Sequence, residues 1–101
     1  MEEEIAYAKV HYQGSHRILA ACDKEVMGRR LNKNGNIITI GKEFYGEDTV
    51  TENGLKIMAM GVESINLLGS VVVDIFISDG LLDRSSVILV DGIPHAQIYF
   101  L

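Results

Sequence analysis

The sequence is poor in residues that cross-link or break a chain. Its 101 residues include one cysteine, one proline and no tryptophan. A single cysteine excludes an intrachain disulfide framework and is typical of proteins from a reducing compartment. The longest strongly apolar stretch, residues 65–77, is interrupted by Gly69, Ser70 and Asp74, and a membrane span needs about 20 apolar residues. The N-terminus is acidic and lacks the apolar region of a signal peptide. We therefore expect a cytoplasmic protein with no membrane partner.

The motifs of common cofactor, metal and catalytic sites are also missing. Neither GxGxxG nor GxxxxGK[ST] occurs, so the usual nucleotide-binding loops are absent. No CxxC or HExxH spacing accompanies the three histidines, and His11, His16 and Cys22 do not converge as zinc ligands must. A lone strand cysteine more often packs as a small hydrophobic residue than acts as a nucleophile. The sequence predicts no metal and no cofactor, and it favours a non-catalytic protein over an enzyme.

What the chain does contain is a globular composition with an uneven charge distribution. It is 48% hydrophobic and 23% charged, enough to form one domain over residues 1–101. The net charge is −5, which disfavours general binding to polyanions and leads us to expect no DNA partner. Residues 5–42 nevertheless hold seven cations and two acids (+5), whereas residues 43–101 hold two cations and nine acids (−7). This asymmetry indicates either a charged partner surface or two halves that complement each other within one fold.

Residues 5–23 predict a β-hairpin. Gly14 and Ser15 form its turn, because glycine can take the positive φ of a type II′ turn. Gln13 then faces His16, and the pairing continues outward from there. One face of this hairpin is small and apolar and suits a covering helix: Ala6, Ala8, Val10, Leu19 and Ala21. The other face is mixed: Tyr7, Lys9, His11, Ile18 and Cys22.

The next segment predicts short elements. Lys24–Met27 is one helical turn, with Asp23 as its N-cap and Gly28 as its end. Asn34-Gly35 is a strong turn signal before a strand at residues 36–40. Residues 42–46 are too short for an assignment, although we expect Phe44 and Tyr45 to fold back onto the sheet.

A helix is predicted after Thr49, which forms a capping box with Glu52. Its core-facing stripe has helical spacing and comprises Leu55, Met58, Ala59 and Val62. Residues 70–79 fit two patterns. Their β-branched residues favour a strand, whereas a helical repeat with Ser70 as cap and Gly80 as stop favours a helix. Residues 86–101 predict two strands around Asp91-Gly92, with Pro94 at a strand start or on an edge.

Four stretches carry a family resemblance: RILAACDKEVMGRRL, KEFYG, INLLGS and, above all, DGIPHAQIYFL. In that order and spacing they resemble an uncharacterised family of small archaeal proteins, domain-of-unknown-function family 424. Gly92–Gln97 matches the family's Gly-Val/Ile-Pro-His-Ala-Gln pattern. The resemblance covers nearly all of the chain after Glu4. It implies an α+β domain in which residues 70–79 are helical, and a loose association with RNA or translation. It supplies no catalytic residues.

These observations together predict a single α+β domain. A small antiparallel or mixed sheet, made of the N-terminal hairpin, the middle strand and the C-terminal strands, packs against two helices. The leading hypothesis is a non-catalytic binding module that contacts RNA or a translation-associated protein through residues 17–42. Its candidate binding residues are Arg17, Arg29, Arg30, Lys33, Asn66, His95 and Gln97.

The alternative hypothesis is a small-molecule binder or small enzyme. Its site would be a polar pocket around His95, Gln97, Asn66 and Cys22. His95 and Gln97 have two possible roles. They tie the last strand to Cys22-Asp23 or Phe44-Tyr45 by hydrogen bonds, or with Asn66 they line a pocket for a ligand or an RNA base. A third possibility is a homo-oligomer formed through an exposed edge of the final strand.

Overall fold

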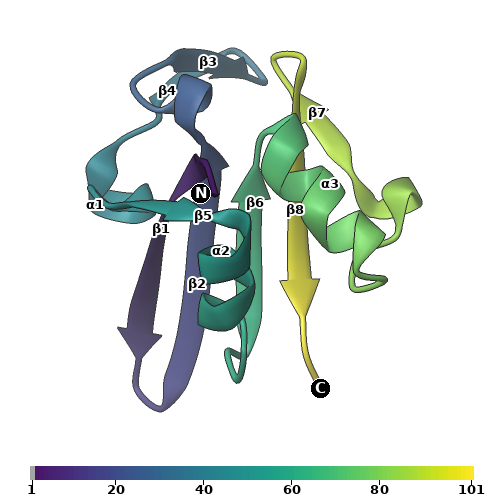
Figure 1. The fold of residues 1–101 in the computed structure, drawn as a ribbon. Coiled ribbons are helices and arrows are strands. Elements are labelled where there is room, and N and C mark those ends of the chain that lie inside the picture. The colour runs from purple at the N-terminus through teal and green to yellow at the C-terminus, as the bar shows by residue number, and fades with distance from the viewer. Residues whose placement is uncertain (1) are drawn as a thin grey trace.

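The protein folds as a six-stranded mixed sheet with its two longer helices on one face and a separate two-stranded hairpin at one end (Figure 1). The computed structural model describes residues 2–101. In sheet order the strands are β5 (Thr49–Thr51), β1 (Glu4–Gln13), β2 (His16–Asp23), β6 (Ser64–Leu68), β8 (Ile93–Tyr99) and β7 (Ile88–Val90). Strands β2 and β6 run parallel, and the other neighbours are antiparallel. The predicted α+β class is confirmed. No helix in residues 2–101 is long and apolar enough to span a membrane.

The N-terminal hairpin has the predicted register. Gln13 pairs with His16, and the ladder continues to Ala6 opposite Asp23. Gly14 has a φ of 62°, and Ser15 does not have a positive φ, as a type II′ turn requires. The apolar face of the hairpin is buried under the helices, since Ala6, Ala8, Leu19 and Ala21 all belong to the main core.

Helix α2 (Glu52–Met58) supplies part of the layer over this core. Its N-cap is Thr51, whose hydroxyl accepts a hydrogen bond from the Gly54 N–H at 3.0 Å. The prediction of Thr49 as the cap was therefore wrong, because Thr49 pairs with β1 and the helix begins only after that short strand ends. Leu55 is fully buried, as the helical stripe predicted.

Helix α3 (Ser70–Ser78) confirms the helical interpretation of residues 70–79. Its cap comes from a distant strand: the Asp23 carboxylate accepts hydrogen bonds from the N–H groups of Val71 (3.0 Å) and Val72 (2.9 Å). Asp23 is the N-cap residue of the 3-10 turn at Lys24–Val26, as predicted, although its side chain makes no cap bond there. The prediction of Ser70 as the cap of α3 was wrong, because the N-cap of this helix is Gly69. The buried carboxylate satisfies N–H groups that the first turn of a helix leaves unpaired.

Gly69 makes this cap possible. It lies between β6 and α3 with φ 124° and ψ 150°, a conformation that is essentially restricted to glycine. A Cβ atom at this position would lie 2.2 Å from Cγ of Asp23. The glycine therefore provides both the backbone bend and the space that the capping carboxylate occupies.

The opposite face of the sheet is covered only in part. The hairpin of β3 (Arg30–Lys33) and β4 (Asn36–Thr39) and the single turn α1 (Lys42–Tyr45) pack over one end of it. Asn34-Gly35 forms the predicted turn, and the predicted strand at 36–40 corresponds to β4. A second core fills the space beneath and comprises Ala20, Cys22, Val26, Leu31, Ile40, Tyr45, Leu68 and Val90.

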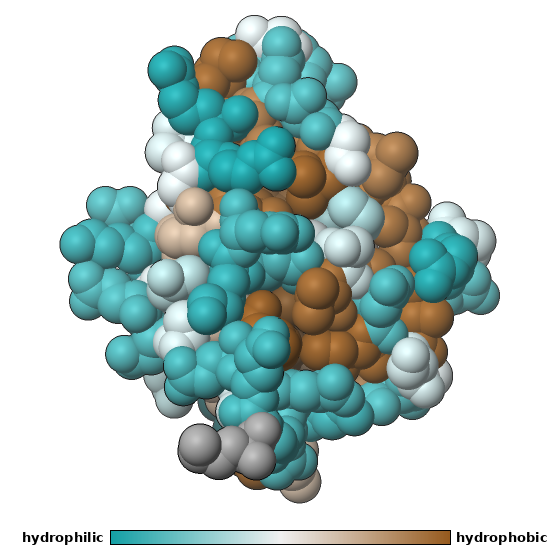
Figure 2. Space-filling view, turned by 45° about the horizontal axis from the view of Figure 1, so that its top comes forward, coloured by the Kyte–Doolittle hydropathy of each residue, from teal (hydrophilic) through white to brown (hydrophobic). Residues whose placement is uncertain are grey.

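The C-terminal strands meet at Asp91-Gly92, both with positive φ, as in a type I′ turn. Strand β8 lies between β6 and β7 in the sheet order, but β7 pairs only with the first three residues of β8. Residues 96–99 pair with β6 alone, so this part of the final strand keeps an unpaired edge, and a homo-oligomer formed through it stays a prediction. Ile88 and Leu89 of β7 are 54% and 69% exposed. Figure 2 shows hydrophobic side chains reaching the surface on the side that α3 and β7 occupy, and hydrophilic ones on the side of α1 and β1.

Candidate functional site

The candidate site lies on the sheet face opposite α2 and α3, where β2, β6 and β8 run side by side. The register of these strands places their side chains in three rows across the sheet. The rows are Cys22–Leu68–His95, Ala20–Asn66–Gln97 and Ile18–Ser64–Tyr99. The four residues that the sequence suggested for a polar pocket, His95, Gln97, Asn66 and Cys22, therefore share one face and occupy two adjacent rows.

Asn66 and Gln97 are direct cross-strand partners and line one pocket of about 240 Å³. The pocket is also lined by Ile18 and Ser64 from the sheet, Phe44 from α1 and Tyr99 from β8. No charged side chain lines it. The structure thus brings together two of the four suggested residues in a small cavity whose walls are polar, aromatic and aliphatic.

Both amide oxygens in this pocket already have tyrosine partners. The Tyr45 hydroxyl donates to Oδ1 of Asn66 at 3.2 Å, and the Tyr99 hydroxyl donates to Oε1 of Gln97 at 2.7 Å. Within residues 2–101 the side-chain NH2 groups of Asn66 and Gln97 have no acceptor. These NH2 groups are the hydrogen-bond donors that the two amides have available for a ligand.

Cys22 is fully buried in the second core and does not line the pocket. Burial, with a smaller contribution from the Asp23 carboxylate, raises the pKa of its thiol to about 12. A thiol with this pKa is protonated at neutral pH, whereas a nucleophilic cysteine needs the thiolate. Burial likewise raises the pKa of the neighbouring Tyr45 hydroxyl. Cys22 therefore has the properties of a packed residue, not those of a catalytic one.

His95 is half-buried and lies one row from the pocket, on the same face as Gln97 but not among the lining residues. Burial lowers the pKa of its imidazole, and the nearby Lys33 ammonium lowers it further. Its Nδ1 atom is buried and has no hydrogen-bond partner within residues 2–101. No hydrogen bond links His95 to Cys22-Asp23 or to Phe44-Tyr45 in this part of the chain.

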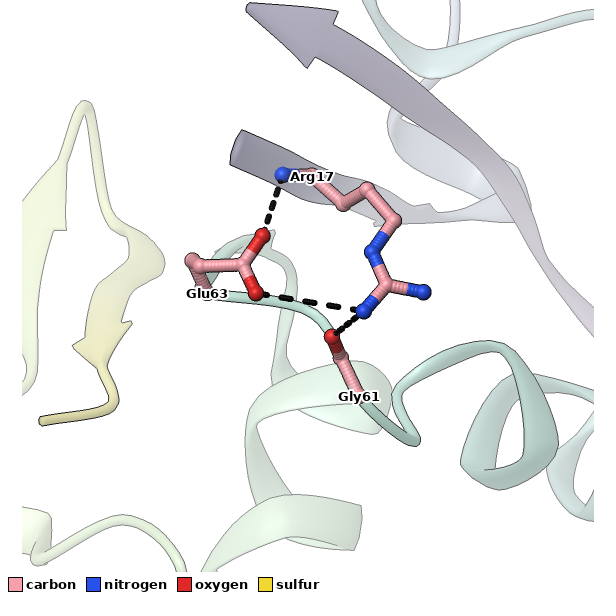
Figure 3. A network of polar contacts seen from close by, with 3 residues as sticks. All are labelled: Arg17, Gly61 and Glu63. Atoms are coloured by element: carbon pink, nitrogen blue, oxygen red, sulfur yellow. Dashed lines mark hydrogen bonds and ion pairs between the residues drawn. The ribbon is translucent and has the colours of Figure 1, made fainter. Parts of the chain in front are cut away.

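The suggested cationic residues lie at two opposite ends of the molecule. Arg29, Arg30 and Lys33 are exposed on or beside β3, and none makes an ion pair within residues 2–101. Arg17 lies at the far end of β2, where its guanidinium contacts the Gly61 carbonyl and pairs with Glu63 at 3.9 Å (Figure 3). The Arg17 backbone N–H also donates to Glu63 at 2.6 Å. The basic segment 17–42 is therefore not one continuous surface.

The sequence predicted that Phe44 and Tyr45 fold back onto the sheet, which Tyr45 confirms by its place in the second core, but not that Phe44 and Tyr99 line a pocket. Phe44 stacks on His11, with ring centroids 5.0 Å apart, and Nε2 of His11 lies 2.6 Å from the Phe44 carbonyl oxygen. The ring of Phe44 also meets that of Tyr45 edge-on at 4.9 Å. The stretch KEFYG was a signal for these contacts, since aromatic residues in a one-turn helix must pack against something else. Residues 2–101 hold no group of three or more His, Cys, Asp and Glu side chains suited to a metal ion.

Fold and site together define a small α+β sheet domain with one face covered by helices and one face that carries a small, mainly apolar pocket with two side-chain amides. The chain belongs to the family of proteins of unknown function DUF424, whose model matches residues 10–101. A crystal structure of an uncharacterized conserved protein from Methanopyrus kandleri is similar to it, with a TM-score of 0.81 and 26% identity over 95% of this chain and 91% of the other. Comparison with curated proteins finds no match.

Proposed function

We propose that this protein is a non-catalytic module that binds single-stranded RNA, with Arg29, Arg30 and Lys33 as its phosphate contacts. The observation that carries the proposal is that these three cations are exposed at one end of the molecule without acidic partners in residues 2–101. A protein of net charge −5 has no general attraction for polyanions, so a local cluster must provide it.

The position of the cluster also supports RNA as the ligand. Strand β3 packs over the sheet face that holds the pocket, since Leu31 belongs to the same core as Leu68 and Val90. Alternation along β3 places Lys33 on the side of Leu31, toward that face, and Arg30 on the outer side. Single-stranded nucleic acids are bound by cations that neutralise phosphates beside aromatic rings that stack on bases. Phe44 and Tyr99, which are 41% and 68% exposed, supply such rings on the same face.

The test is RNA affinity measured by fluorescence anisotropy as a function of salt. We expect Arg29→Ala/Arg30→Ala to weaken binding of a labelled single-stranded RNA at least tenfold at about 150 mM salt. The slope of log K against log salt should fall by about 1.4, because each lost phosphate contact contributes about 0.7 for single strands. The matched control, Lys56→Ala/Arg84→Ala, removes two cations that form ion pairs elsewhere and should leave the slope unchanged.

Two outcomes would refute the proposal: wild-type protein that binds no RNA, or an equal loss in both double variants. If the protein instead captures a translation-machinery protein, with the same dependence on Arg29 and Arg30, the β3–β4 hairpin binds a protein and not RNA.

A second candidate function is the binding of a small free molecule. The pairing of Asn66 with Gln97 in a 240 Å³ pocket favours it. The high pKa of the buried Cys22 thiol argues against a catalytic version of this function that uses that thiol. Calorimetric titration with nucleosides in the absence of RNA separates this candidate from the first.

A further inference from the structure

We infer that the pocket between Asn66 and Gln97 receives one base of the bound RNA, which stacks on an aromatic ring and is held by the two side-chain amides. This inference rests on the proposed function and adds to it a specific base-binding site. It has three supports: the size and walls of the pocket, the hydrogen-bonding groups that it offers, and its place beside the cationic hairpin.

The pocket suits one planar ring system. Its volume of about 240 Å³ is below the range of about 300–1,000 Å³ that is usual for drug-sized ligands. Phe44 and Tyr99 line it and keep part of their ring surfaces exposed. Stacking on such rings is the common way in which proteins hold an unpaired base. Charged side chains are absent from the lining, as expected for a site that contacts a base and not a phosphate.

The hydrogen-bonding groups predict which bases fit. The oxygens of Asn66 and Gln97 are engaged by Tyr45 and Tyr99, so the amides present their NH2 groups as donors. Two neighbouring donors match a base edge that consists of acceptors. Guanine has such an edge in its O6 and N7 atoms, and cytosine has one in N3 and O2. A carbonyl oxygen of uracil has two lone pairs and can accept from both donors, whereas adenine has no carbonyl oxygen and its amino group lies between N1 and N7. We therefore expect RNA that contains guanosine, cytidine or uridine to bind more tightly than oligoadenylate.

The pocket is also within reach of the phosphate contacts. His95 precedes Gln97 by two residues on β8, which places the two side chains about 7 Å apart on one face. Lys33 lies on the same side of β3 as Leu31, and Leu31 shares a core with Leu68, the cross-strand partner of His95. The charge of Lys33 accordingly lowers the pKa of the imidazole. A base held at Gln97 would thus have its neighbouring phosphate near Lys33, and the strand would continue toward the outer face of the hairpin.

The first experiment compares variants of the pocket with matched variants elsewhere, using a labelled oligouridine of about eight nucleotides. Tyr99→Leu removes an exposed ring from the pocket, and Gln97→Leu removes one amide. Their controls are Tyr12→Leu, at a tyrosine that is 75% exposed and alternates to the helix side of β1, and Gln13→Leu at the hairpin end. We expect Tyr99→Leu to weaken binding about 5- to 150-fold, because base stacking is worth about 1–3 kcal/mol. The salt slope should not change, and both controls should bind like wild type.

A second variant tests the base preference separately from folding and stacking. Tyr99→Phe keeps the ring and removes the hydroxyl that engages Oε1 of Gln97. The freed amide can then turn its oxygen toward the base. We expect oligouridine to remain bound and its advantage over oligoadenylate to shrink. In NMR spectra of wild-type protein, the side-chain NH2 signals of Asn66 and Gln97 should shift on addition of oligouridine, and those of Gln13 should not.

The outcomes separate this inference from the proposed function. RNA binding that depends on Arg29 and Arg30, but is unchanged in Tyr99→Leu and Gln97→Leu, would overturn the base pocket and leave the RNA module in place. Absence of any oligonucleotide binding would overturn both. Binding of free uridine in the pocket without binding of oligouridine would overturn RNA as the source of the base.

Discussion

The two faces of the one sheet use their residues differently. Under α2 and α3 the strands present small or apolar residues, such as Ala8, Ala21 and Ala96, and this face is closed. On the other face, polar and aromatic residues alternate with apolar ones, and α1 and the β3–β4 hairpin cover only one end. The comparison shows that neighbouring residues of one motif can have different roles, since Ala96 is buried in the core and Gln97 is exposed on the opposite face.

The same comparison separates the residues of the family pattern into two groups, those that build the fold and those that line the pocket. Asp23 and Gly69 form the cap of α3 on the closed face, and Cys22 is packed in the second core. Asn66 and Gln97 line the pocket on the open face. The first group explains the architecture, and the second group is where a ligand can be contacted.

The largest effect is expected on the closed face, from Gly69→Ala. The new Cβ would lie 2.2 Å from Cγ of Asp23, and alanine disfavours φ 124°. We expect a loss of at least about 3 kcal/mol of unfolding free energy, combining backbone strain with disruption of the cap. The control is Gly80→Ala, where φ is 76° but the space is open, and we expect a loss of about 1 kcal/mol. Urea unfolding of both variants measures the difference, and equal losses would show that the Asp23 contact does not matter.

A smaller effect is expected from the second core when the pH rises. The pKa of the Cys22 thiol is raised from 9.0 to about 12 in the folded protein, so the folded state favours the protonated form. This stability is fully present below about pH 9 and is lost as the pH rises toward 12, at about 1 kcal/mol for each pH unit. Tyr45 acts in the same direction. Urea unfolding between about pH 8 and 11 should show a shallower decline in Cys22→Ala than in wild type. Parallel declines would contradict the burial argument.

The smallest effect is expected at Arg17, and it tests whether the cation at the start of β2 acts differently from those that follow the end of this strand. Its partly exposed pair with Glu63 should be worth at most about 1 kcal/mol. We expect Arg17→Ala to lower the unfolding free energy by no more than that and to leave the RNA affinity and salt slope unchanged. A loss of affinity as large as that of Arg29→Ala/Arg30→Ala would place Arg17 within the RNA-binding surface.

Local patterns predicted the elements whose determinants lie close together in the chain. The register of the first hairpin follows from Gly14 and the alternation beside it, and Asp91-Gly92 sets the last hairpin in the same way. Such turns depend on the φ values available to a few residues. The helical form of residues 70–78 was harder, because their β-branched residues favour a strand, their helical repeat favours a helix, and only the family resemblance decided between the two.

The predictions were least accurate for helix caps, where the residue that decides the outcome is distant in the chain. Asp23 was assigned to the turn that follows it, but its carboxylate caps a helix that begins 47 residues later in the chain. Thr49 had the spacing of a capping box, but pairing with β1 left Thr51 as the cap. A sequence pattern shows which residues can cap a helix, but competition among them is resolved only by packing.

The sequence by itself determined the α+β class, the order of the main elements and the excess of positive charge in residues 5–42, because these depend on composition and short-range periodicity. Only the tertiary structure decided that β6 lies between β2 and β8, and this arrangement places Asn66 beside Gln97. The physical reason is that strand order and the convergence of side chains depend on pairing and burial between segments that are distant in the sequence. The spacing of residue types within one segment does not specify them.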